Sequence, residues 1–283
     1  MTQLGILHPG QMGISIAASA QNSGCQVYWV SEERSEQTRQ RAAEHHLIET
    51  ETLTDLCQNC EVLVSVCPPH AADAVAQAVI AAGFQGLYVD ANAIAPQRAI
   101  RMGQRMQVAE IDFVDGGIIG GPAWEAGRTW LYLSGPRAQA VADCFAAGPL
   151  ETQVIGTEIG KASALKMCFA AYTKGTTALL SGILATAESL GVRQELENQW
   201  SRDGSDFANQ TQNRVRRATA KAWRFEGEMK EIAATLASTG IPGGFHTSAA
   251  EIYRRMADFK DSAETPELEA VLAALLLLPR DGN

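Results

Sequence analysis

A glycine-containing turn near the N-terminus has residue types and spacing suited to holding a phosphate. His8-Pro9-Gly10-Gln11-Met12-Gly13 lies between a strand-like apolar run and a helical pattern. Gly10 would let the backbone approach a pyrophosphate, Gly13 would let the helix pack on the strand, and the helix N-terminus offers N–H groups to the anion. A second strand is predicted over 26–30, which completes the layout of a dinucleotide-binding unit. His8 stands where such a turn usually has its first glycine, and an ordinary strand–turn–helix is the alternative interpretation.

The segment after the second predicted strand holds groups that distinguish NAD from NADP. Its sequence is Ser31-Glu32-Glu33-Arg34-Ser35. A carboxylate such as Glu32 would hold a ribose 2′-hydroxyl, whereas Arg34 with the hydroxyls of Ser31 and Ser35 would hold a 2′-phosphate. Ser35 is equally suited to cap the helix predicted over 36–44. We expect NADP as the cofactor, with NAD as the alternative.

Lys166 is the candidate acid–base group, near the start of the longest predicted helix, about 160–190. Apolar residues recur along this helix at spacings of three and four, which is the period of one buried helical face. A partly desolvated lysine beside a helix N-terminus has its charged form disfavoured, which suits it to proton transfer. On the residues alone, a solvent-exposed lysine is the favoured interpretation of this position. Lys174, eight residues on, is a second candidate cation.

The order of predicted elements divides the chain at this long helix. Strands and helices alternate through residues 1–157, as in a doubly wound, mostly parallel sheet. Residues 158–283 show only helical patterns, ending in a helix over 266–278. We therefore predict an α/β fold, with an N-terminal Rossmann-type NAD(P)-binding domain followed by an all-α domain for substrate binding and dimerisation. Gly175 and Gly182 lie on one side of the long helix, where small residues permit close contact with another helix.

Two further segments follow predicted strands at the edge where ligands of such sheets lie. Cys67 and Pro68 follow the strand over 61–66, and a proline there ends the strand and turns the chain across the sheet edge. Four glycines fall within Gly116–Pro122, after a strand over 112–115. They could expose successive N–H groups to a carboxylate, and a flexible loop is the alternative.

The composition argues for a cytoplasmic protein with a small-molecule partner. The net charge of −9 disfavours nucleic acid and anionic membranes as partners. We see no signal peptide, and the apolar run over 271–278 is too short to cross a bilayer. Cys57-x-x-Cys60 is a lone pair without nearby histidines, so we predict no metal site, and a redox pair is the alternative. We expect the six cysteines to be free thiols.

Four segments carry a family resemblance by their sequence and their order: Gly5–Gly13, the prolines after Cys67, Asp115–Gly121 and Gly160–Lys166. Together they resemble the β-hydroxyacid dehydrogenase superfamily, which includes 6-phosphogluconate and 3-hydroxyisobutyrate dehydrogenases and the imine reductases. The block Trp223–Ala233 is similar to the branch of phosphogluconate-dehydrogenase-like NAD(P)-dependent oxidoreductases. The resemblance covers essentially the whole chain, and it implies an intertwined homodimer formed through the helical domain.

The resemblance also implies roles for individual residues. It makes Lys166 the catalytic lysine and assigns Asp115, Gly120 and Gly121 to the substrate. It assigns cofactor binding to two segments. The glycine turn contributes Gly10, Gln11, Met12 and Gly13, and the segment along the nicotinamide side contributes Cys67 and Pro68. His246, from the helical domain, is a further candidate substrate contact, and a surface or capping histidine is the alternative.

Three departures from this family pattern bear on the substrate and the turn. Ile119 stands where hydroxyacid members have a serine, Ala170 stands where they have an asparagine, and His8 replaces a glycine. Two polar contacts to the usual 3-hydroxyacid are therefore missing. The predicted function is hydride transfer between NADP(H) and a small hydroxy or oxo acid, or a related polar carbonyl compound. Reduction of a C=N bond, and a catalytically silent NAD(P)-binding sensor, are the alternatives.

Overall fold

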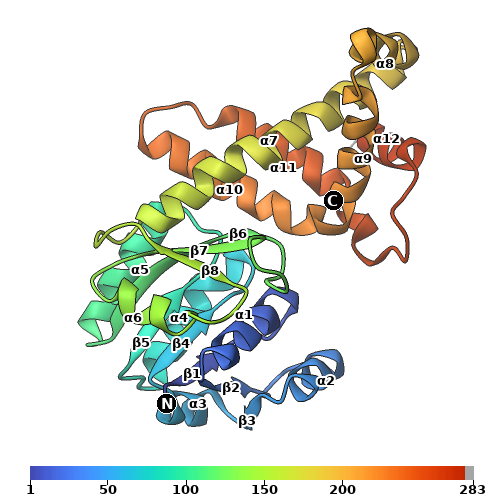
Figure 1. The fold of residues 1–283 in the computed structure, drawn as a ribbon. Coiled ribbons are helices and arrows are strands. Elements are labelled where there is room, and N and C mark those ends of the chain that lie inside the picture. Colours follow the sequence, from blue (N-terminus) through green and yellow to red (C-terminus); the bar gives the residue numbers. More distant parts are fainter. Residues whose placement is uncertain (278–283) are drawn as a thin grey trace, which may run out of the picture. The chain divides into compact units, whose positions relative to one another are not determined.

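The computed structural model describes residues 1–277, which fall into two compact units that divide after Met167 (Figure 1). Helix α7 (Lys161–Ser189) begins in the first unit and continues in the second. It matches the long helix predicted over about 160–190. None of the helices in the described part of the chain has the length and apolar character required to cross a bilayer.

The first unit is built on one eight-stranded sheet, in the order β3-β2-β1-β4-β5-β6-β7-β8. All neighbouring strands pair in parallel except β6 and β7, which are antiparallel. The central strands are buried on both faces, which is why they read as apolar runs. The strands are β1 (Gln3–Ile6), β2 (Gln26–Val30), β3 (Ile48–Thr50), β4 (Val62–Ser65), β5 (Leu87–Asp90), β6 (Asp112–Gly120), β7 (Thr129–Ser134) and β8 (Glu151–Val154).

Helices cover both faces of this sheet, which confirms the predicted doubly wound α/β fold. One apolar cluster joins the sheet to α1 and α6, and a second joins it to α3, α4 and α5. The helices of this unit are α1 (Gln11–Asn22), α2 (Glu36–Glu44), α3 (Leu53–Asn59), α4 (Ala72–Ala81), α5 (Pro96–Val108) and α6 (Ala138–Asp143).

The short edge elements are absent from the sequence-based prediction. Strand β3 has three residues, of which two are exposed, so it shows no apolar run. Strand β8 is also mostly exposed, so it too shows no apolar run. Strand β6 is longer than predicted, because it continues through the glycine-dense segment as far as Gly120.

The second unit is helical throughout its described residues, as predicted. After α7 come α8 (Arg193–Trp200), α9 (Phe207–Ala218), α10 (Ala222–Ser238), α11 (Gly244–Arg255) and α12 (Leu268–Leu276), with short 3₁₀ turns between some of them. Position 278, the predicted end of the last helix, lies outside the described residues. A Cβ atom on Gly175 would lie 2.9 Å from Nε2 of His246 on α11, so this glycine permits a helix contact within the chain.

Candidate functional site

The strand order reverses between β1 and β4. Strands β2 and β3 lie on one side of β1, and β4, β5 and β6 lie on the other. Loops that leave the carboxyl ends of β1 and β4 therefore run in opposite directions, which opens the crevice where doubly wound sheets bind ligands. The loop after β1 holds His8–Gly10, and the loop after β4 holds Val66–Pro69.

The turn after β1 has the features that a pyrophosphate requires. A Cβ atom on Gly13 would lie 2.1 Å from the carbonyl oxygen of His8, so only glycine lets α1 start this close to β1. A Cβ atom on Gly10 would meet nothing within 4 Å. Gly10 caps α1 without a side-chain hydrogen bond, and the first helical bond runs from the Ile14 N–H to the Gly10 carbonyl. The N–H groups of Gln11, Met12 and Gly13 are thus those that a helix leaves for an anion. The turn fits the pyrophosphate of a dinucleotide.

Arg34 extends from the end of β2 back to the end of β1. Its guanidinium donates to the carbonyl oxygen of Leu7 at 3.4 Å. The hydroxyl of Ser35 accepts from the Thr38 N–H at 3.3 Å, so Ser35 caps α2. The hydroxyl of Ser31 is buried and donates to the carbonyl oxygen of Thr50 at 3.3 Å. Arg34 thus lies beside the glycine turn, whereas the Ser31 hydroxyl already has a structural partner.

His8 is held as a neutral imidazole beside Arg34. Burial and the positive charge of Arg34 lower the pKa of His8 to about 4. The buried Nδ1 of His8 and Nε of Arg34 have no hydrogen-bond partner among the described residues. Arg41, which sequence reasoning missed, donates from Nη1 to the carbonyl oxygen of Pro9 at 3.2 Å. Two arginines of the β2–α2 segment therefore hold the backbone of the glycine turn.

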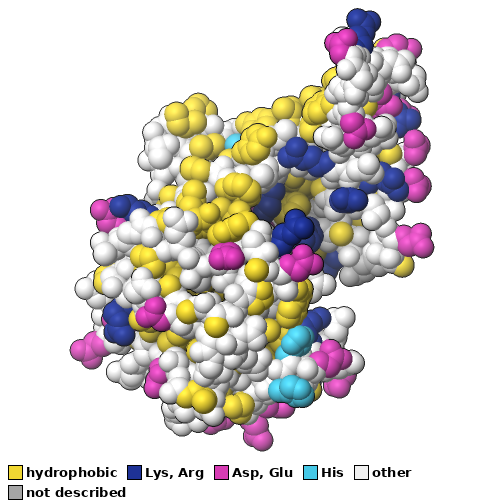
Figure 2. All heavy atoms as spheres, viewed as in Figure 1, with side chains coloured by type: hydrophobic (Ala, Val, Ile, Leu, Met, Phe, Trp, Pro, Cys, Tyr) yellow, Lys and Arg dark blue, Asp and Glu magenta, His cyan; other side chains and the backbone are white. Residues whose placement is uncertain are grey.

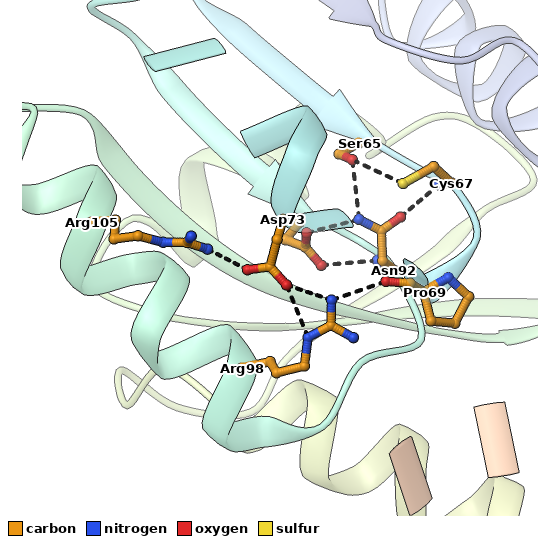
Figure 3. Close-up of polar contacts among 8 residues, drawn as sticks. Ser65, Cys67, Pro69, Asp73, Asn92, Arg98 and Arg105 are labelled. Carbon is orange, nitrogen blue, oxygen red and sulfur yellow. Dashed lines mark hydrogen bonds and ion pairs between the residues drawn. The ribbon is translucent and has the colours of Figure 1, made fainter. Parts of the chain in front are cut away.

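Cys67 opens the loop after β4, and its environment makes it unreactive. Burial raises the pKa of the Cys67 thiol to about 12, with the carboxylate of Asp90 acting in the same direction. The thiol therefore stays protonated and is a poor nucleophile. The Cys67 N–H donates to the side chain of Asn92 at 2.6 Å (Figure 3). Sequence reasoning missed Asn92, although it directly follows the predicted strand over 87–90.

Asp115 has a different role from the predicted substrate contact. Its carboxylate is fully buried and accepts hydrogen bonds from the N–H groups of Gly160 and Ser163, each at 3.0 Å. It also accepts from the hydroxyls of Ser163 at 2.5 Å and Ser134 at 3.0 Å. Burial raises the pKa of Asp115, while these donors act in the opposite direction. We therefore reassign Asp115 to anchoring the first turn of α7.

Most of the glycine-dense segment is a strand, which corrects the alternative of a flexible loop. Residues Gly116–Gly120 pair with β7. A Cβ atom on Gly117 would lie 2.6 Å from the carbonyl oxygen of Ala162 and 3.1 Å from Cβ of Lys166, so this glycine admits α7. Gly120, with a φ of +129°, and Gly121 are exposed at the end of the strand.

Lys166 lies against β6 on the second turn of α7. It is half-buried, and its ammonium donates to the carbonyl oxygen of Ile118. Strand β5 pairs with β6 only as far as Asp115, three residues before Ile118. The Lys166 ammonium therefore lies beyond the carboxyl end of β5. It shares this edge of the sheet with the glycine turn and with Cys67.

Lys174 and His246 belong to the second unit, and each has a partner there. The ammonium of Lys174 pairs with the buried carboxylate of Glu228 and lies 4.5 Å from the centroid of the Phe225 ring. Nε2 of His246 lies 3.3 Å from the carbonyl oxygen of Ala171. The buried Nδ1 of His246 has no partner among the described residues. Glu228 thus neutralises Lys174, the second candidate cation.

The described residues contain no group of three or more histidine, cysteine or acidic side chains arranged to hold a metal ion. The six cysteines are free thiols in this structure.

Comparisons with known proteins agree with the geometry of the first unit. Residues 3–146, just over half of the 283, match the family model of the NAD-binding domain of 6-phosphogluconate dehydrogenase. Residues 187–256 match a domain of unknown function, DUF1932.

Three relatives extend this similarity to most of the chain. An uncharacterized 28.5 kDa protein in the 7S RNA 5′ region of Methanothermus fervidus is 31% identical over 185 residues, which cover 64% of this chain and 70% of that protein. The conserved protein MTH1747, described as structurally similar to 3-hydroxyacid dehydrogenases, is 28% identical, with a TM-score of 0.66 and coverage of 90% and 97%. The 3-hydroxyisobutyrate dehydrogenase of Mycobacterium tuberculosis shares the fold at 18% identity, with a TM-score of 0.69 and coverage of 98% and 100%. The chain therefore belongs to the family with the NAD-binding domain of 6-phosphogluconate dehydrogenase, and with it to the β-hydroxyacid dehydrogenase-like superfamily of NAD(P)-dependent oxidoreductases.

Proposed function

We propose that this protein transfers a hydride between NADP(H) and a small hydroxy or oxo acid, or a related polar carbonyl compound, with Lys166 as the general acid and base. The observation that carries the proposal is the half-buried ammonium of Lys166 beyond the carboxyl end of β5. The N-terminus of α1 opens at the same edge of the sheet.

The chain's own groups are suited to hold the dinucleotide. The N–H groups of Gln11, Met12 and Gly13 would bind the pyrophosphate. Arg34 and the hydroxyl of Ser35 would bind the 2′-phosphate, since Arg34 already lies beside the turn. Cys67 and Pro68 would line the nicotinamide side, and NAD is the alternative cofactor.

Lys166 would supply the proton that balances the hydride. The bound cofactor supplies the hydride to the carbonyl carbon of the oxo acid. The Lys166 ammonium would donate its proton to the carbonyl oxygen, which becomes the hydroxyl, and the neutral amine would take that proton back in the oxidation. Gly120 and Gly121, which are exposed, would face the substrate carboxylate. His246 stays a candidate substrate contact on the sequence argument alone.

We propose a homodimer formed through the helical residues, with the NAD(P)-binding domain ending near residue 157. Apolar side chains gather along α7 (Figure 2). A groove of about 520 Å³ lies between α7 and α11, and Leu179, Phe245 and Leu190 in its lining are exposed. Obligate dimer interfaces are typically large and apolar. The acidic net charge favours a small-molecule substrate over nucleic acid, and a cytoplasmic location stays a prediction.

Reduction of a C=N bond is the second candidate. Ile119 is half-buried and Ala170 is buried, so neither offers the polar contact that a 3-hydroxyacid would use. Steady-state consumption of NADPH and NADH across panels of oxo acids, aldehydes and cyclic imines tests the proposal. Turnover of carbonyl compounds supports the first candidate and turnover of imines supports the second. Tight cofactor binding without any turnover would favour a catalytically silent sensor.

A further inference from the structure

The Cys67–Pro69 part of the loop after β4 contains one main-chain N–H group in three residues, and that group is already bound. Pro68 and Pro69 have no N–H, so the Cys67 N–H is the only main-chain donor of Cys67–Pro69. It donates to Oδ1 of Asn92 at 2.6 Å. The carbonyl oxygen of Pro68 accepts from the Ala71 N–H at 2.9 Å as the next helical turn begins. The amino end of this loop is therefore fixed by a side chain from the end of β5.

Asn92 is itself held in one orientation by three further hydrogen bonds. Its Nδ2 donates to Oγ of Ser65 at 3.0 Å and to Oδ2 of Asp90 at 2.8 Å. Its main-chain N–H donates to Oδ1 of Asp90 at 3.1 Å. The side chain is buried, at 2% exposure. Because the Cys67 main-chain N–H can only donate, the Asn92 oxygen faces Cys67 and its amide nitrogen faces Ser65 and Asp90.

A second side chain holds the other end of the loop. Nη2 of Arg98, on α5, donates to the carbonyl oxygen of Pro69 at 3.0 Å. Nε of Arg98 donates to Asp73 on α4 at 3.1 Å, and Arg105 binds the other oxygen of the same carboxylate (Figure 3). Arg98 and Arg105 thus share Asp73, but of this pair Arg98 is the one that contacts the loop among the described residues.

The position of this loop gives the two contacts a functional meaning. Dinucleotides lie across the point where the strand order reverses, with the adenosine half over the strand that follows the glycine turn. Here that strand is β2, on the side of β1 that carries Arg34. The nicotinamide half must then lie on the other side, over β4 and β5, whose carboxyl ends hold Cys67 and Asn92.

We propose that Asn92 and Arg98 are positioning residues, which fix the Cys67–Pro69 loop as a rigid wall against the nicotinamide ring. The proposal rests on the proposed cofactor function. Hydride transfer depends steeply on the distance and orientation of the two carbons, so a wall that stops the ring from tilting raises the fraction of productive complexes. Two prolines between two anchored ends lose little further conformational entropy when the ring binds.

Arg98→Met and Arg105→Met form a matched pair that tests the Arg98 contact. Each variant removes one arginine from Asp73, but only Arg98→Met also removes the contact to Pro69. Binding is measured by calorimetry with NADPH and with 2′-phospho-ADP-ribose, which lacks nicotinamide. We expect Arg98→Met to weaken NADPH binding roughly three- to tenfold, the equivalent of one hydrogen bond, and to leave the fragment unaffected. Arg105→Met should bind both like the wild type, and only Arg98→Met should change the fluorescence of bound NADPH.

Asn92→Ala tests the other anchor without any cofactor. The hydrogen exchange of the Cys67 amide reports directly on its bond to Asn92. We expect this exchange to accelerate about tenfold in Asn92→Ala, while amides in the core of β1 stay protected. If the variant fails to fold, Asn92→Ser, which keeps a hydroxyl at this place, gives the same readout with a smaller change.

Two results would distinguish failure of the positioning role from failure of the cofactor function. If wild type binds NADPH but the two arginine variants bind it equally, or the Cys67 amide exchanges at the wild-type rate in the Asn92 variant, the positioning role is overturned and the cofactor function stands. If wild type binds neither NADPH nor NADH, the proposed function fails and the positioning role fails with it.

Discussion

The Lys166 ammonium donates a hydrogen bond to the carbonyl oxygen of Ile118, which joins the start of α7 to β6 just beyond the carboxyl end of β5. This contact brings a positively charged group to the edge where the α1 N-terminus opens. The close approach of helix and strand depends on Gly117, where a Cβ atom would collide with Ala162 of α7.

Lys166→Met should abolish most of the turnover and spare cofactor binding. Methionine keeps the apolar stem but removes the proton donor, and a positioned acid or base contributes typically ~10²–10⁴-fold to a rate. We expect kcat to fall by that factor while the affinity for NADPH is unchanged. Lys161→Met is the control, because Lys161 is an exposed lysine of the same helix that pairs with Glu158. A Lys166 variant with the wild-type rate would refute the acid–base role.

Arg34→Ala should reduce the preference for NADP(H) over NAD(H). The guanidinium lies beside the glycine turn, where it can form a charge-assisted bond to a 2′-phosphate, worth roughly 1.5–3 kcal/mol. We expect calorimetry to show at least about tenfold weaker NADPH binding and little change for NADH. Glu32→Gln is the opposing variant. If Glu32→Gln weakens the binding of NADH while Arg34→Ala changes the affinity for neither cofactor, Glu32 holds the ribose instead.

The lowered pKa of His8 should make the fold less stable in mild acid. The unfolded chain takes up a proton on His8 near pH 6.5, but the folded protein does so only near pH 4. Between these values the unfolded state binds more protons, so the free energy of unfolding falls as the pH falls from 6.5 to 4. The loss from this group is on the order of 3 kcal/mol at pH 4.

Urea unfolding across this pH range, with His8→Gln, checks the His8 prediction. The variant should lose this part of the pH dependence. The comparison with wild type is necessary because burial also raises the pKa of Asp90 to about 7, which works in the opposite direction. Parallel pH profiles for wild type and His8→Gln would show that His8 does not titrate as described.

Asp115→Asn should destabilise the fold rather than weaken substrate binding. The amide oxygen can still accept from the N–H groups of Gly160 and Ser163, which share one carboxylate oxygen, but the amide nitrogen replaces the oxygen that accepts from the Ser163 hydroxyl, and the negative charge beside the start of α7 is lost. We expect the free energy of unfolding to fall by roughly 1–3 kcal/mol, and by about 1 kcal/mol for Ser163→Ala, which removes one bond of the same network. Denaturation curves measure both. Unchanged stability with a raised KM would restore Asp115 to the substrate site.

Leu179→Arg should dissociate the proposed homodimer. Leu179 is 47% exposed in the groove between α7 and α11, and a charge there would oppose burial against a second copy. Light scattering at micromolar concentration should report a dimer for wild type and a monomer for the variant. Asn213→Arg, at an exposed position of α9, should stay dimeric. A monomeric wild type would contradict the prediction.

Short-range sequence patterns were sufficient to predict the fold class and to locate several candidate site residues. The alternation of strands and helices, the place of Gly13 and the start of α7 follow from residue periodicity and local turn chemistry, which act over a few neighbouring residues. The edge strands β3 and β8 escaped prediction because they are short and largely exposed, so no apolar run marks them.

The tertiary structure decided what the polar residues of the first unit do. Asp115 holds Ser163, 48 residues away, and Asn92 holds Cys67, 25 residues away, across neighbouring elements of the sheet. A carboxylate or an amide in a sequence does not reveal whether its hydrogen bonds go to a ligand or to a distant main-chain N–H. The glycines of β6 gave the same ambiguity, because a free N–H group and a close helix contact both require the absence of a side chain. Only the packing of α7 on β6 resolved it, since that contact is made by residues remote in the sequence.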